Sequence, residues 1–161
     1  MRVGSEAKSH RSVLDALDPC DLARVGGGLL WMGDGGVACE RPVHEVRVAS
    51  FRIGRSLVSR AAYRRFLDEN PREPLPRFWT RSRWSEPDAP VVGVSWEAAR
   101  RFAAWAGCRL PSEGEWEYVG RLSDCVRRSL GICDLFGKVV QWLEDDWHAS
   151  YIGFRLARSE P

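Results

Sequence analysis

Residues 90–121 of the chain read PVVGVSWEAARRFAAWAGCRLPSEGEWEYVGR. A short β-rich run at residues 91–94 precedes a helix that we expect to open at Ser95, a natural N-cap, with the carboxylate of Glu97 in its first turn. Apolar residues recur at spacings of three and four along one face of this helix: Ala98, Ala99, Phe102, Ala103, Trp105 and Ala106. That spacing is typical of an amphipathic helix, and Gly107 predicts its end.

A second helix start follows within a few residues. Ser112 and Glu115 have the Ser-x-x-Glu spacing of a capping box, so we expect a helix from this point. Glu113, Glu115 and Glu117 also present paired carboxylates that general acid–base chemistry could use. We favour the structural interpretation, because Glu115 is needed for the capping box and Glu113 suits the helix dipole. Two helix starts with three tryptophans among them predict the packing centre of a small domain.

The same residues carry a family resemblance. Residues 94–98 (VSWEA) and 109–118 (RLPSEGEWEY) are similar to the signature of the formylglycine-generating enzyme family, also called the sulfatase-modifying factor domain. The resemblance covers roughly residues 26–158, and residues 1–25 are expected to be a partly disordered lead-in. It implies an α+β, C-type-lectin-like fold with short antiparallel strands, two main helices, long irregular loops and termini that meet in one sheet.

Composition restricts the classes of function. With 161 residues and a formal net charge of +2, the chain fits one domain and gives no electrostatic case for a nucleic acid or an anionic membrane as partner. No apolar stretch has the length of a transmembrane helix, and the first residues lack the apolar core of a signal peptide. We therefore expect a cytoplasmic protein. Five cysteines without a Cys-x-x-Cys pair argue against a complete disulfide framework.

The first half of the chain predicts strands and one helix. The glycines at 26–28 precede an apolar run at 29–33, which we interpret as a turn into a strand rather than a phosphate loop, because no Gly-Lys-Ser/Thr follows. Alternating valines indicate a half-buried strand over residues 43–53. A helix follows, with Tyr63, Phe66 and Leu67 on one face.

A long loop is predicted at residues 70–89, because its four prolines exclude a regular helix. Its aromatic residues alternate with arginines and could form a binding surface. Alternatively, the tryptophans anchor the loop on the core while the arginines are solvated. Our candidate binding residues, which include two from the closing segment, are Trp79, Arg83, Trp84, Trp147 and Arg155.

Candidate metal ligands come from the last third of the chain. Residues 131–142 resemble the family's Gly-Leu-Tyr-Asp-Met-x-Gly-Asn-Val-Trp-Glu-Trp run, in which the acidic residue helps to bind calcium. The resemblance thus points to Asp134, Gly137, Val139 and Gln141 as metal ligands, and it implies copper, iron or calcium as the metal. Gln141 in place of Glu removes a charged oxygen ligand and weakens a hard-cation site. His148 follows the acidic residues 144–146. Together they could bind a metal or act in acid–base catalysis, or they could form a solvated turn at the surface.

Two hypotheses for function remain open. In catalytic members of the family, a long segment between the Trp-Glu-Trp run and the closing Gly-Phe-Arg strand holds a copper-binding cysteine pair. In this chain only residues 143–152 separate Trp142 from Gly153, and no cysteine follows Cys133, so no catalytic residue is assigned. The chain is either an oxygen- and metal-dependent oxidoreductase acting on a cysteine or small thiol, or a non-catalytic, lectin-like binding or accessory module.

Overall fold

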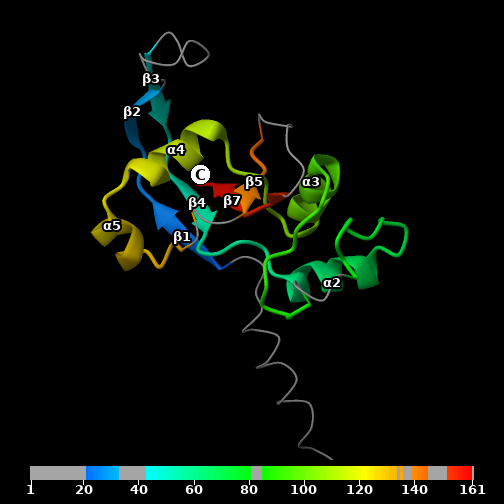
Figure 1. The fold of residues 1–161 in the computed structure, drawn as a ribbon. Helices are drawn as coiled ribbons and strands as arrows, with labels where there is room; N and C mark the ends of the chain where they lie inside the picture. Colours follow the sequence, from blue (N-terminus) through cyan, green and yellow to red (C-terminus); the bar gives the residue numbers. More distant parts are fainter. Residues whose placement is uncertain are drawn as a thin grey trace, which may run out of the picture.

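A computed structural model of the chain describes residues 21–32, 43–80, 85–133, 135, 139–144 and 152–160. Within these ranges, four short strands are followed by four short helices and then by three more short strands, which confirms the α+β class (Figure 1). In chain order the elements are β1 (Leu22–Val25), β2 (Gly28–Met32), β3 (His44–Val48), β4 (Phe51–Gly54), α2 (Arg60–Glu69), α3 (Trp96–Trp105), α4 (Glu113–Arg121), α5 (Asp124–Ser129), β5 (Val140–Gln141), β6 (Ile152–Gly153) and β7 (Ala157–Ser159).

The central sheet joins the two ends of the described chain. Its strands run antiparallel in the order β1-β4-β7, so the first and last strands flank β4, as the resemblance implies. Ala23, Ile53 and Ala157 lie side by side in register and are fully buried against the core. β1 thus belongs to the domain although it lies within the expected lead-in.

The prediction of one strand over residues 43–53 is wrong, because the structure has two strands there. β3 ends at Val48 and pairs with β2, whereas β4 begins at Phe51 and pairs with β1 and β7. Between Val48 and Phe51 the chain passes from one sheet to the other and runs close to Gly27. A Cβ on Gly27 would lie 2.4 Å from the Val48 carbonyl oxygen. A glycine permits this approach, and the crossing divides the alternating pattern.

The helix starts agree with the sequence. The Ser95 hydroxyl accepts a hydrogen bond from Ala98 N at 3.2 Å, and Ser112 and Glu115 form both bonds of the capping box. Gly107 follows α3 with φ +65°, the left-handed conformation that ends helices. The β-rich run at 91–94 forms no strand, because Gly93 has φ +74° and interrupts the extended backbone.

Two main apolar clusters form the core. One packs α2 against α3 through contacts between aromatic rings, and the other packs α4 against the strands. Tyr63 is at the centre of the first cluster, with its ring 5.4 Å from that of Phe102 at an interplanar angle of 17°. The prediction that Tyr63, Phe66 and Leu67 share a buried face is confirmed. Among the described helices, none has the length and hydrophobicity needed to cross a bilayer.

Candidate functional site

The segment that carries the predicted metal ligands is held by the closing strand. β5 pairs in parallel with β6, and Trp142 N donates to Gly153 O at 3.1 Å. Gly153 permits the approach, because a Cβ there would lie 2.9 Å from Val139 Cγ1 and 3.0 Å from Val91 O. The two residues that flank residues 143–152 are therefore bonded directly to each other.

Indole groups fix the same segment to the helices. Trp142 Nε1 donates to Val94 O at 2.8 Å, and Trp96 Nε1 donates to Leu143 O at 2.9 Å. Buried Trp N–H groups need such acceptors, and here both bonds cross between residues 94–96 and 142–143. Trp96 of the sequence signature and Trp142 of the later run thus position the candidate site.

A buried arginine lies next to this segment. The side chain of Arg155 is fully buried, and its Nε donates to Gln141 Oε1 at 2.6 Å, while its Nη1 and Nη2 donate to Gly54 O at 2.9 Å and Cys133 O at 3.0 Å. Gln141 Nε2 in turn donates to Leu135 O at 3.0 Å. Both ends of the amide are therefore used inside the protein, which fixes its orientation. This network joins β4 and β5 to the closing segment, residues 152–160.

A second polar centre lies at the start of α4. Arg109 donates to both carboxylate oxygens of Glu115, at 2.7 and 2.6 Å, and Ser112 N donates to Glu115 Oε2 at 2.9 Å. The hydrogen bonds to Glu115 raise the pKa of Arg109. The Glu115 carboxylate therefore has a structural role here, consistent with the structural interpretation of this motif.

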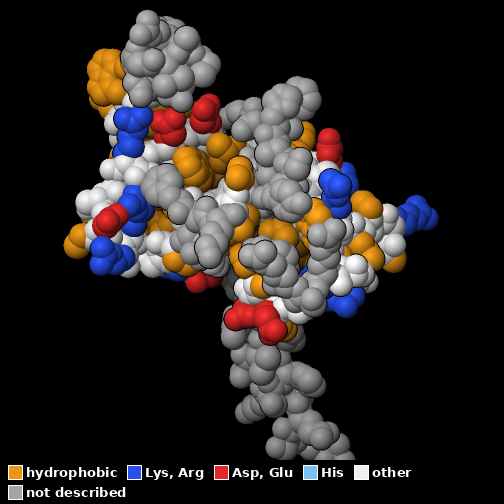
Figure 2. All heavy atoms as spheres, in the orientation of Figure 1, with side chains coloured by type: hydrophobic (Ala, Val, Ile, Leu, Met, Phe, Trp, Pro, Cys, Tyr) orange, Lys and Arg blue, Asp and Glu red, His pale blue; other side chains and the backbone are white. Residues whose placement is uncertain are grey.

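The sequence did not indicate a groove of about 330 Å³ between the β2–β3 hairpin and the first turn of α4. Gly114 leaves room for it, since the nearest apolar atom to a Cβ there would be Met32 Sδ at 3.6 Å. Apolar side chains are exposed beside α4 (Figure 2). The residues that line the groove are Met32, Val46, Arg47, Val48, Ala49, Ser112, Glu113, Gly114 and Glu115.

The predicted binding residues are in different environments. Trp79 is 7% exposed and packs on Tyr63, with the Arg60 guanidinium 3.9 Å from the centre of its ring. That position corresponds to the loop-anchoring alternative. Arg155 is in the buried network. Arg83, Trp84 and Trp147 lie outside the described residues, so their roles stay predictions.

The predicted metal ligands are only partly described. Val139 and Gln141 are buried, whereas Asp134, Gly137 and His148 lie outside the described residues. Within the described ranges, no three His, Cys, Asp or Glu side chains are grouped as a metal site. The Gln141 oxygen already accepts from a guanidinium, and this arrangement does not fit calcium, because the two cations would be adjacent.

Comparison with known proteins places this geometry in a family. The family model described as the sulfatase-modifying factor enzyme 1-like domain matches residues 15–128. The solved structure of PvdO from Pseudomonas aeruginosa superimposes with a TM-score of 0.64 at 18% identity, covering 88% of this chain and 97% of that one. This likeness concerns the fold alone.

Curated relatives match over shorter stretches. Hercynine oxygenase of Mycolicibacterium thermoresistibile is 38% identical over 105 residues, which cover 48% of this chain and 24% of that protein. The formylglycine-generating enzyme of Streptomyces coelicolor is 60% identical over 35 residues (22% of this chain, 11% of that protein). The inactive C-alpha-formylglycine-generating enzyme 2 of Bos taurus is 59% identical over 32 residues (20% and 11%). The chain thus spans a quarter or less of the length of these relatives.

Proposed function

The chain belongs to the sulfatase-modifying factor enzyme 1-like family, and from this premise we propose that it is a non-catalytic binding or accessory module on that family's fold. One observation carries the proposal: the hydrogen bond from Trp142 N to Gly153 O joins the two residues that flank residues 143–152. By resemblance, catalytic members place their copper-binding cysteine pair in a long segment at this position. Residues 143–152 of this chain contain no cysteine.

The Arg155–Gln141 network supports the same proposal. In the family run that residues 131–142 resemble, the acidic residue at position 141 helps to bind calcium. Here the Gln141 amide bonds to Arg155 and to Leu135 O instead. The closing segment is thereby held by side-chain hydrogen bonds that require no ion, as suits a domain retained for its shape.

The second candidate is an oxygen- and metal-dependent oxidoreductase acting on a cysteine or a small thiol. Its specific support is the 38% identity to a protein named hercynine oxygenase over 48% of the chain. The short, highly similar stretches do not discriminate between the candidates, because a protein named formylglycine-generating enzyme and one named inactive C-alpha-formylglycine-generating enzyme 2 match this chain at 60% and 59% identity.

Oxygen uptake separates the two candidates. The purified chain is supplied with copper or iron and then with a cysteine-containing peptide, or with hercynine and a thiol, while dissolved oxygen is recorded. We expect no uptake above that of the same metal and substrates without protein, with the Streptomyces coelicolor enzyme as the positive control. Circular dichroism checks that the chain is folded. Stoichiometric metal binding together with thiol-dependent uptake would overturn the proposal in favour of the oxidoreductase.

A further inference from the structure

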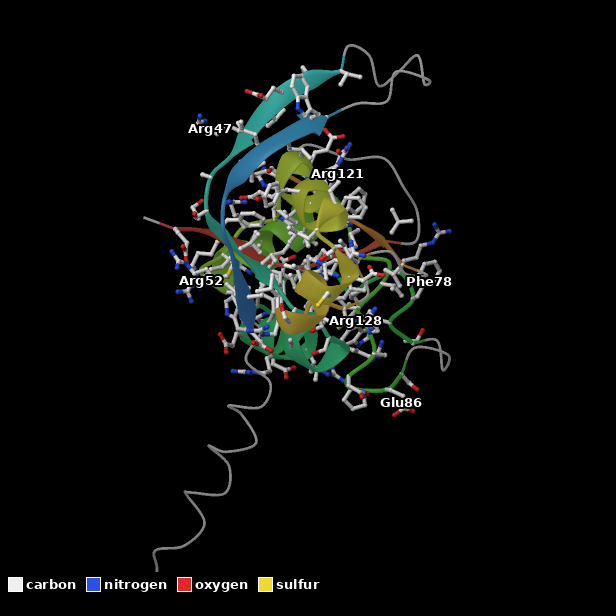
Figure 3. All side chains as sticks on the ribbon, turned by 90° about the vertical axis from the view of Figure 1, so that its left-hand side faces the viewer. Arg47, Arg52, Phe78, Glu86, Arg121 and Arg128 are labelled. Carbon is white, nitrogen blue, oxygen red and sulfur yellow. The ribbon has the colours of Figure 1, made fainter. Side chains whose placement is uncertain are left out.

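The exposed face of the central sheet carries a row of arginines. Arg24 on β1 is in register with Arg52 on β4, which is in register with Arg158 on β7. Neighbours in the register project from the same face of a sheet, and the residues on either side of Arg24 and Arg52 are buried. In Figure 3, Arg52 projects outward on the left of the strands, away from Phe78 and Glu86 on the right. We call Arg24, Arg52 and Arg158 the arginine row.

One carboxylate already binds this row. Glu160 Oε2 accepts from Arg24 Nε at 2.6 Å, and its Oε1 accepts from Arg52 Nε at 3.1 Å. The pKa of Glu160 is lowered by its hydrogen bonds to these arginines. The side chains of Arg24 and Arg52 are nevertheless 72% and 51% exposed. Their Nη donors have no partner within the described part of the chain and face solvent.

Like charges in register destabilise a sheet, and one Glu among three Arg leaves the row with a net positive charge. Arg158 also bonds to the end of α3, since its Nε donates to Gly107 O at 3.1 Å. Its Nη2 donates to Ala106 O at 3.5 Å and to Cys108 Sγ at 3.4 Å, so the Arg158 guanidinium is held in place at one end of the row.

We propose that the arginine row binds a short, carboxylate-rich segment of a partner protein. Glu160 demonstrates the geometry, with a carboxylate bridging two neighbouring arginines. Adjacent strands are about 4.8 Å apart, so the row spans roughly 10 Å, the length of about three extended residues. Two or three acidic side chains of one segment thus complement the row. The inference does not depend on whether the domain is catalytic.

The size of the row favours a peptide over other anions. Nucleic-acid binding commonly rests on about 6–10 phosphate contacts, and polybasic membrane sites on about 4–8 basic residues. The arginine row has three members, and the formal net charge of the whole chain is +2. A short acidic peptide requires no more charge than this.

Fluorescence anisotropy with a labelled peptide of alternating Glu and Ser tests the proposal. We expect binding that weakens with added salt, and a loss of about fivefold or more in R24Q/R52Q. The matched control is R121Q/R128Q, which removes the same charge from α4 and α5, where both side chains are exposed. This control should bind like the unmodified protein. Equal losses in the two double variants, or no binding by the unmodified protein, would overturn the proposal.

A second pair of variants tests the role of Glu160. E160Q removes the internal carboxylate that competes for Arg24 and Arg52, so peptide binding should strengthen by about two- to fivefold. E117Q makes the same change of charge but releases Arg121 on α4, and should have no effect. Equal strengthening in both would mean that only net charge matters, which overturns the site. Tighter binding to an oligothymidylate or to phosphatidylserine vesicles than to the peptide overturns the proposed partner class.

Discussion

Replacing Tyr63 by Phe should stabilise the protein, contrary to the usual effect of removing a buried hydroxyl. Tyr63 lies in α2 with no exposed surface, among the rings of Phe66, Trp79, Phe102 and Phe154. Its hydroxyl is buried and has no hydrogen-bond partner among the described residues. The substitution therefore removes a buried polar atom without breaking a bond.

The magnitude follows from two opposing contributions. An unsatisfied buried polar group costs about 1–3 kcal/mol, and Phe removes this cost. The vacated space of roughly 10 Å³, at about 24 cal/mol per Å³, costs only about 0.2 kcal/mol. We expect Y63F to raise the free energy of unfolding by about 0.5–2 kcal/mol at pH 7, measured by urea denaturation.

The pH dependence gives an independent measurement. Burial, with a smaller contribution from Glu73, raises the pKa of Tyr63 from 10.0 to about 12. The folded state therefore keeps the proton more tightly than the unfolded state, so this contribution is fully present below pH 10 and is lost as the pH rises toward 12. At about 1.4 kcal/mol per pKa unit, the loss is at most roughly 3 kcal/mol. Y63F lacks it, so the stability difference between the two proteins should grow across this range.

Either of two results would refute this reasoning. Destabilisation of Y63F by more than about 0.5 kcal/mol would mean that the hydroxyl makes a stabilising hydrogen bond. Parallel stability curves for the two proteins between pH 10 and 12 would mean that burial does not restrain ionisation of Tyr63. Spectrophotometric titration of the phenol, with Y63F as the blank, locates the pKa directly.

Three further substitutions test the packing of the candidate site and of α4. G153A should lower the free energy of unfolding by about 1–3 kcal/mol, because its Cβ would lie 3.0 Å from Val91 O. The control G26A, with no atom within 4 Å of its Cβ, should leave the free energy of unfolding nearly unchanged in the same denaturation assay. Q141L should lower the free energy of unfolding by about 3 kcal/mol, because it removes the hydrogen-bond acceptor of the fully buried Arg155. A melting temperature unchanged from that of the unmodified protein would contradict the network. S112A should lower the free energy of unfolding by about 1 kcal/mol, because the capping box is lost. S123A, at the exposed start of the short α5, should lower it by less. Equal losses of stability in the two variants would show that the capping box adds nothing.

Local features of the fold could be predicted from the sequence, because their causes are local. Ser95 and the Ser112–Glu115 pair cap helices through atoms three residues apart, and the spacing alone indicates this. The run at 91–94 misled us because its valines favour a strand, while the left-handed conformation of Gly93 depends on how the chain packs near Phe78.

The non-local features could not be predicted. The burial of Arg155 and its bond to Gln141 depend on how β4, β5 and the closing segment meet. The arginine row combines residues from three distant parts of the chain, and only the strand register brings them together. The unpartnered hydroxyl of Tyr63 likewise emerges only when the surrounding rings are packed.

The pairing of β4 with β7 has a consequence for synthesis of the protein. Phe51 is opposite Ser159, so the central sheet cannot be completed until almost the whole described chain has been translated. Until then β4 has a free edge, which is a template for pairing with other chains. Contacts so distant in sequence also form slowly. The domain therefore completes its fold only once β7 has been synthesised, and a nascent chain that ends before β7 is most exposed to aggregation along β4.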